Sequence, residues 1–152
     1  MVWKPHVTVA AIIENNNRFL LVEEETSNGL AFNQPAGHLE KGEDLIYAVK
    51  REVFEETAWQ FEPEYIVSVQ LWRRNPDFPS FLRVCFAGRC HSHDPAQILD
   101  DGIIATHWLT REEVAAKKQQ LRSPLVLIGI DEFLSGTRHP LSLIQSFLDL
   151  DT

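Results

Sequence analysis

With 152 residues, 44% of them hydrophobic and 24% charged, the chain has the length and composition of an ordinary globular protein. Its formal net charge of −8 argues against sequence-independent binding of nucleic acid, because neutralising phosphates requires clustered lysine and arginine. Residues 1–6 lack the apolar core of a signal peptide, and no uncharged apolar run approaches the ~20 residues of a membrane helix.

The first part of the chain predicts a strand hairpin. Residues 6–13 are β-branched and apolar, the three asparagines at 15–17 indicate a turn, and 18–23 are expected to form the returning strand. Residues 26–29 are expected to form a loop, and 34–37 a short extended segment.

The clearest helix is predicted over 44–57. Its apolar residues recur on one face of a 3.6-residue period, which indicates that this face packs on the core. These residues are Leu45, Ile46, Val49 and Val53.

Three further strands are predicted over 65–72, 81–90 and 103–109, with a proline-rich turn at 75–79. Two cysteines, Cys85 and Cys90, lie five residues apart in one of these strands. Their side chains therefore point to opposite faces, which argues against a disulfide between them and favours a reducing cytoplasm.

Two helices are expected near the end of the chain. Thr110, with Glu113 three residues later, forms a capping box for a helix through Gln120. A second helix is expected from Ser123-Pro124 to about Ser135. Strands with interspersed helices indicate the mixed α/β class, and no repeat or linker interrupts them, so we expect a single domain over 1–152.

Three carboxylates share one face of the helix 44–57. Glu52, Glu55 and Glu56 stand at i, i+3 and i+4, within an arc of roughly 100°. Like charges at this spacing destabilise a helix, and Arg51 cannot neutralise all three. A hard divalent cation such as Mg²⁺ or Mn²⁺ would do so, whereas a solvated acidic face is the alternative explanation.

The loop before this helix adds a possible ligand. Two glycines, Gly37 and Gly42, permit a tight path and a close approach of backbone to a bound group. A backbone carbonyl near Gly37 would offer one more oxygen to a metal held by the helix.

Residues 37–59 resemble the Nudix box. Gly37, Glu43, the pair Arg51-Glu52 and the pair Glu55-Glu56 stand at the spacing of that motif. The one departure is Ala58, which stands where the family usually has glycine at the left-handed end of the helix.

The resemblance extends along nearly the whole chain to the NudJ group of bacterial phosphatases, through 6–10, 33–40 and 121–126. It implies an α/β/α sandwich around a mixed sheet and Mg²⁺-dependent hydrolysis of phosphoanhydride bonds. The implied substrates are nucleoside di- and triphosphates and hydroxymethylpyrimidine pyrophosphate, with thiamine pyrophosphate as a further candidate.

The same resemblance implies roles for the box residues. Glu52, Glu55 and Glu56 would be metal ligands, with the Gly37 carbonyl as an additional one. Glu52 would also orient or accept the proton of the attacking water. Glu43 and Arg51 are expected to form a salt bridge that braces the loop against the helix.

Other acids have simpler explanations. Asp100 and Asp101 precede a strand and would suit a metal, but an ordinary Asp-Asp-Gly turn is the favoured interpretation. The run Glu23-Glu24-Glu25 is expected to be a solvated strand end.

The substrate is expected to meet arginine and aromatic side chains. Arg73 and Arg83 lie on neighbouring predicted strands, and Arg122 precedes a helix start, where anions are favoured. A strand-end charge cluster beside a core tryptophan, Trp72, is the alternative.

The expected partner is a small phosphorylated metabolite, bound by a monomer or small homo-oligomer. Two other functions stay open: an ADP-ribose or nucleoside-diphosphate-sugar pyrophosphatase, and a Nudix-like domain that binds a nucleotide without hydrolysing it. A calcium-binding scaffold is disfavoured, because the sequence has no EF-hand loop pattern.

Overall fold

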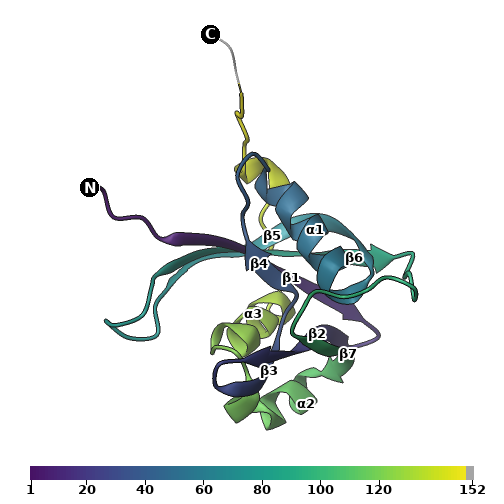
Figure 1. Cartoon of the computed structure of the whole chain (residues 1–152). Helices are drawn as coiled ribbons and strands as arrows, with labels where there is room; N and C mark the ends of the chain where they lie inside the picture. The colour runs from purple at the N-terminus through teal and green to yellow at the C-terminus, as the bar shows by residue number, and fades with distance from the viewer. Residues whose placement is uncertain (150–152) are drawn as a thin grey trace.

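The computed structural model describes residues 1–149, which form one mixed sheet flanked by helices (Figure 1). The strands are β1 (His6–Asn15), β2 (Arg18–Thr26), β3 (Gly29–Asn33), β4 (Ala36–His38), β5 (Gln60–Trp72), β6 (Phe81–His91) and β7 (Ile103–Thr110). The α-helices are α1 (Leu45–Thr57), α2 (Arg111–Ala116) and α3 (Leu125–Leu134), and the 3-10 turns are η1 (Lys118–Gln120) and η2 (Leu141–Leu143).

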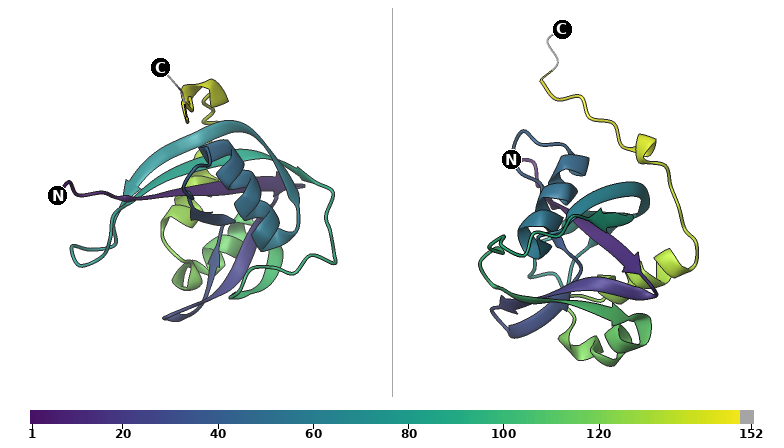
Figure 2. Two further views of the ribbon diagram at one scale, coloured as in Figure 1. Left: turned by 45° about the horizontal axis from the view of Figure 1, so that its top comes forward. Right: turned by 90° about the vertical axis from the view of Figure 1, so that its right-hand side faces the viewer.

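The seven strands form a mixed sheet. Five of them follow the order β3-β2-β1-β6-β5, while β4 pairs with β1 and β7 pairs with β2. β1 and β6 are parallel, and the pairs β5–β6, β1–β4, β1–β2, β2–β3 and β2–β7 are antiparallel. β1 pairs with β2 only near their shared turn, so the two strands diverge and the sheet opens between β4 and β3 (Figure 2).

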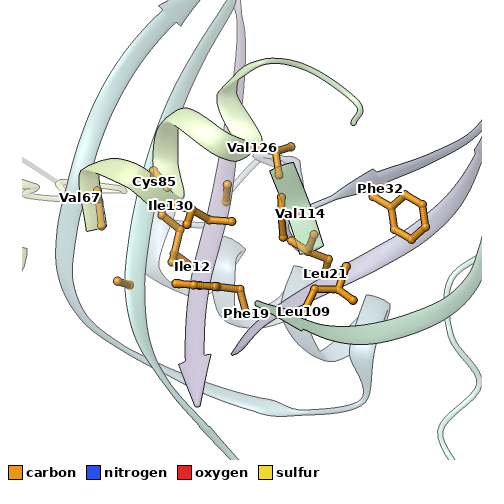
Figure 3. Close-up of a cluster of buried hydrophobic side chains, with 12 residues drawn as sticks. Ile12, Phe19, Leu21, Phe32, Val67, Cys85, Leu109, Val114, Val126 and Ile130 are labelled. Carbon is orange, nitrogen blue, oxygen red and sulfur yellow. The ribbon is translucent and has the colours of Figure 1, made fainter. Parts of the chain in front are cut away.

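Alternate residues of β1 serve two cores on opposite faces of the sheet. Ala10 and Ile12 pack with residues of α2 and α3, in the cluster drawn in Figure 3. Val9, Ala11 and Ile13 pack with α1. The predicted α/β/α sandwich is confirmed, because helices cover both faces of the sheet.

Helix α1 follows the sequence prediction closely. Asp44 is its N-cap, and the side chain accepts a hydrogen bond of 2.7 Å from the Tyr47 amide. Val49 and Val53 are fully buried, as the apolar period predicts. Ala58 ends the helix in the left-handed conformation, with φ 63° and ψ 13°, so alanine adopts the conformation that glycine usually supplies.

Several element predictions need correction. Strand β3 was not predicted: residues 26–29 were expected to form a loop, but β2 extends through Thr26 and pairs with β3 from Gly29 on. β5 begins at Gln60, five residues earlier than expected. The helix from Thr110 has the predicted capping box but breaks at Lys117, after which the chain tightens into η1.

The free thiols agree with the cysteine prediction. Cys85 is buried and Cys90 is half-buried, and neither forms a disulfide. Among residues 1–149, no helix is both long and apolar enough to cross a membrane.

Candidate active site

Three carboxylates converge at the carboxyl-terminal half of α1. Oxygen atoms of Glu52, Glu55 and Asp100 lie within 4.8 Å of one another. Asp100 reaches this position because its backbone amide donates a hydrogen bond of 2.9 Å to the carbonyl of Glu55. The loop before β7 is thereby attached to the helix that carries the other acids.

The interpretation of Asp100 as only a turn residue therefore needs correction. Its carbonyl does accept a hydrogen bond from the Ile103 amide, as a turn requires, but its carboxylate also joins Glu52 and Glu55. Asp100 was a candidate for an additional metal-binding acid, but the contact could not be predicted, because Asp100 and Glu55 lie 45 positions apart and only the fold brings them together.

Arg51 is the cation of this acidic region. Its guanidinium contacts Glu43 at 2.6 Å, Glu52 at 2.9 Å and Glu55 at 3.1 Å. It also donates a hydrogen bond of 3.1 Å to the carbonyl of His38. The expected ion pair of Glu43 with Arg51 is present, and it ties the loop to the helix.

Glu56 points to the strand β4. Its carboxylate accepts a hydrogen bond of 2.8 Å from the Ala36 amide and is 7% exposed. Burial raises the pKa of Glu56 to about 9. Burial also raises the pKa of Glu52 to about 7, although Arg51 opposes this shift. Both carboxylates are therefore costly to ionise without a further cation.

Gly37 allows β4 to approach α1. A methyl group at this position would collide with the carboxylate of Glu52, so any larger residue requires the strand or Glu52 to move. The glycine is thus required by a close approach, and not by a left-handed backbone.

The register of β4 decides which carbonyls face the acids. The carbonyl of Pro35 and the amide of Leu39 bond to β1, whereas the Ala36 amide and the His38 carbonyl bond to α1. Because the two sides alternate along a strand, the Ala36 carbonyl faces α1 and the Gly37 carbonyl faces β1.

A pocket of about 550 Å³ opens beside this edge of the sheet. Its walls come from β2 and β3, from β4, from the β5–β6 hairpin and from the segment that leads into α3. The lining includes Glu24, Ala36, Trp72, Arg74, Phe81, Arg83 and Arg122. Ala36 and Gly37 line the pocket, so it adjoins the acidic cluster.

The expected substrate arginines lie in different settings. Arg83 and Arg122 line the pocket, whereas Arg73 is absent from its walls and Arg74 takes that place. Arg74 lies two residues beyond the end of β5, whose last residue, Trp72, also lines the pocket. Arg122 is held by Glu24, at 3.0 Å.

Glu23 and Glu24 are not a solvated strand end. Glu23 bonds to His107 at 2.9 Å, and Glu24 lines the pocket with its side chain only 16% exposed. The prediction was wrong because β2 continues through Thr26 and pairs on both edges.

The family model of the NUDIX domain matches residues 4–127, which include α1, β4 and the acidic cluster. The chain belongs to the Nudix hydrolase family. Its fold is therefore the one that the resemblance to the Nudix box implied.

Curated relatives cover nearly the full length of this Nudix hydrolase. It is 41% identical to "Phosphatase NudJ" of Shigella boydii and 40% identical to "Phosphatase NudJ" of Escherichia coli K12, in each case over 95% of this chain and 94% of the relative. A solved Nudix hydrolase from Nitrosomonas europaea is 42% identical, with a TM-score of 0.92, over 95% of this chain and 98% of that one.

A MutT Nudix hydrolase from Burkholderia pseudomallei, 20% identical, has a TM-score of 0.73 and shares the fold, over 86% of this chain and 98% of that one. Nudix hydrolases generally use divalent metal ions and act on small phosphorylated substrates, and the donor set here fits such an ion. Carboxylate oxygens within 4.8 Å of one another are what hard cations prefer, and the buried acids outnumber the cation Arg51.

Proposed function

We propose that this Nudix hydrolase cleaves phosphoanhydride bonds of nucleoside di- and triphosphates with a divalent cation held by Glu52, Glu55 and Asp100. The observation that carries the proposal is the position of these carboxylates, within 4.8 Å of one another and next to a pocket of about 550 Å³. The volume suits a small phosphorylated molecule.

Glu56 and the Ala36 carbonyl complete the proposed ligand set. Glu56 is buried beside Ala36, and the register of β4 turns the Ala36 carbonyl toward α1. The Ala36 carbonyl thus replaces the Gly37 carbonyl that the sequence suggested. A set of oxygen ligands alone favours Mg²⁺, with Mn²⁺ as a substitute. When bound, the cation screens the phosphate charge and lowers the pKa of a bound water.

We assign the proton of the attacking water to Glu52. The carboxylate of Glu52 lies within 4.8 Å of oxygens of Glu55 and Asp100, beside the position proposed for the cation and the water bound to it. As the water oxygen bonds to phosphorus, the bridging P–O bond breaks, the proton passes to Glu52, and the second phosphate leaves. Arg51 holds Glu52 in place through the bond of 2.9 Å and is itself fixed by Glu43.

The finer substrate assignment rests on the relatives named NudJ. We include hydroxymethylpyrimidine pyrophosphate and thiamine pyrophosphate as candidates, because the resemblance of the sequence implies them. The free thiols Cys85 and Cys90 support a reducing cytoplasm as the compartment.

The test is release of phosphate and pyrophosphate by the metal-loaded protein over a substrate panel. The panel holds nucleoside di- and triphosphates, both pyrimidine and thiamine pyrophosphates, and ADP-ribose. We expect Mg²⁺-dependent turnover of the nucleotides, which chelation abolishes. Turnover of ADP-ribose alone would instead identify a nucleoside-diphosphate-sugar pyrophosphatase. Folded, metal-loaded protein that turns over none of them would identify a binding domain.

A further inference from the structure

Arg83 is a buried cation without an acidic partner. Its residue is 6% exposed, and within residues 1–149 no carboxylate lies within ion-pair distance of its guanidinium. A buried charge normally has an opposite charge beside it, because its desolvation is costly. In a chain with net charge −8, the absence of such a partner at this position indicates a group kept for an external ligand.

Two glutamines hold this guanidinium by their amide oxygens. Arg83 Nη2 donates to Gln34 Oε1 at 2.6 Å, and Nη1 donates to Gln70 Oε1 at 3.2 Å. Both are neutral acceptors, so they orient the guanidinium without neutralising its charge.

The amides themselves are fixed by α3. Gln34 Nε2 donates to the carbonyl of Val126 at 2.8 Å, and Gln70 Nε2 lies 3.5 Å from Glu132 Oε1. Each glutamine therefore turns its oxygen toward Arg83. The guanidinium has five N–H donors, more than the two bonded to glutamine, and the side chain lines the pocket.

The neighbours of Arg83 on the pocket side are aromatic. Trp72 and Phe81 also line the pocket, and their ring centroids are 6.1 Å apart. Both lie two residues from the Gln70–Arg83 pair along β5 and β6, so they project from the same face of the sheet. Aromatic rings beside the N–H donors of a guanidinium suit a flat heterocycle, which can stack on a ring and accept hydrogen bonds at its edge.

Arg83 also lies away from the carboxylates. Arg83 of β6 pairs with Thr8 of β1, which in turn pairs with His38 of β4. Two strand spacings, together about 10 Å, therefore separate Arg83 from the strand edge that faces α1. A diphosphate at the acidic cluster would place the organic part of the same molecule toward Arg83.

We propose that Arg83 is a specificity-determining residue that reads the base of a nucleotide through two parallel hydrogen bonds. The proposal rests on the function proposed above and names its substrate class. Guanine presents O6 beside N7, and cytosine presents O2 beside N3, so each offers two adjacent acceptors in the plane of the ring. Adenine and uracil offer no such pair: the amino group of adenine lies between N1 and N7, and the N3–H of uracil lies between O2 and O4, so neither base presents two adjacent acceptors to a guanidinium.

The test compares binding of the α,β-methylene diphosphates of guanosine, cytidine, adenosine and uridine in Mg²⁺, by calorimetry. These analogues need no turnover, so a failed hydrolysis assay and a failed base preference are separate results. We expect the guanosine and cytidine analogues to bind about tenfold more tightly than the other two.

The variants separate the fork of donors from the charge. Arg83→Lys keeps the cation and loses the fork, so we expect the preference to fall to about twofold or less. Gln70→Met removes one orienting acceptor at a half-buried position and is expected to reduce the preference in part. Arg89→Met is the matched control, because Arg89 lies on the same strand with its side chain 80% exposed, and it should keep the full preference.

Two results would overturn the proposal. One is equal binding of all four analogues by the wild type. The other is an Arg83→Lys variant that keeps the wild-type preference, whether it binds all four analogues as tightly as the wild type or more weakly by the same factor; a uniform loss would indicate a phosphate contact instead. Thermal midpoints of every variant establish that a change in binding is measured on folded protein.

Discussion

Buried charges lie on both faces of the sheet, and the two faces hold them differently. On the α1 face, Glu52 and Glu56 are buried close to further acids, with Arg51 as the contacting cation. On the α3 face, Arg83 is buried between two neutral amides. One face has more negative charge than it can neutralise, and the other has a positive charge with no acid beside it.

The α1 face and the α3 face are therefore suited to ligand groups of opposite polarity. Repelling carboxylates gain from a cation that takes several oxygens at once, whereas a guanidinium held by amides gains from paired acceptors. Both arrangements lower the stability of the free protein, and the bound ligand offsets this cost. The pocket is lined by Arg83 and reaches Ala36 and Gly37, next to the acidic cluster, so a single ligand that carries phosphates and a base would extend from one face toward the other.

The largest expected effect comes from the acidic face. Glu52→Gln keeps the shape of the side chain but removes one ligand charge and the proton acceptor. We expect the rate of phosphate release to fall by about 10²–10⁴-fold, since general-base groups contribute on that scale. Steady-state release of phosphate in saturating Mg²⁺ measures it.

Glu62→Gln is the matched control for this change. Glu62 lies on β5 with its side chain 54% exposed and pairs with Lys50 instead of the acidic cluster. It should leave the rate unchanged. A Glu52→Gln enzyme that keeps more than a tenth of the wild-type rate would assign the proton to another group.

Glu56→Gln tests the cost of the buried acid through pH. The pKa of Glu56 is raised to about 9 in the folded protein, above its ordinary value of 4.5, so unfolding releases a proton between these pH values. Stability of the metal-free protein therefore falls as pH rises from about 5 to 9. Glutamine can still accept from the Ala36 amide and carries no charge, so we expect about 5 kcal/mol of stabilisation at pH 8.

Urea unfolding in EDTA at pH 6 and pH 8 measures this effect. Mg²⁺ should stabilise the wild type more at pH 8 than at pH 6, because the cation binds the ionised acids and displaces protons. If Glu56→Gln leaves the slope of stability against pH unaltered, the acid is not strained, and the contrast between the two faces is lost.

Gly37→Ala tests the close packing between β4 and α1. The added methyl group collides with the carboxylate of Glu52, so the acid must leave its place beside Glu55 and Asp100. A shift of this kind is expected to reduce turnover about 10²-fold. Gly42→Ala is the comparison, in the loop between β4 and α1, with open space around the new methyl group; because Gly42 has φ +85°, this variant should lose stability but keep the metal site. Equal effects on turnover would argue against the packing explanation.

Local patterns in the sequence predicted much of the α1 face. The apolar period predicted α1, the i, i+3, i+4 spacing predicted that Glu52, Glu55 and Glu56 share one face, and the resemblance to the Nudix box implied the pair Glu43–Arg51. Each of these features depends on residues a few positions apart on one helix or its adjoining loop, where helical geometry alone fixes which side chains meet.

Contacts between distant segments were not predicted. Asp100 joins Glu55 through a backbone bond, Arg83 meets Gln34 across β1, and Glu24 meets Arg122. The strand β3 was missed for a related reason, because Gly29–Asn33 has little strand signal of its own and is ordered by pairing with β2. Strand order decides such contacts, and a single sequence does not reveal it.

The smallest expected effect lies where α1 ends. Ala58→Gly relieves a left-handed alanine, worth about 1–2 kcal/mol, but removes a buried methyl group worth about 0.8 kcal/mol and adds freedom to the unfolded chain. These contributions nearly cancel, so the free energy of unfolding, measured in urea, should change by less than about 1 kcal/mol. The amide of Asp94 bonds to the Ala58 carbonyl, which ties the loop that leads to Asp100 to this turn. Turnover should therefore match the wild type if the backbone at 58 already has the conformation that the acidic face needs. A gain in turnover together with a gain in stability would show instead that alanine strains the end of α1 and displaces Asp100 from the other carboxylates.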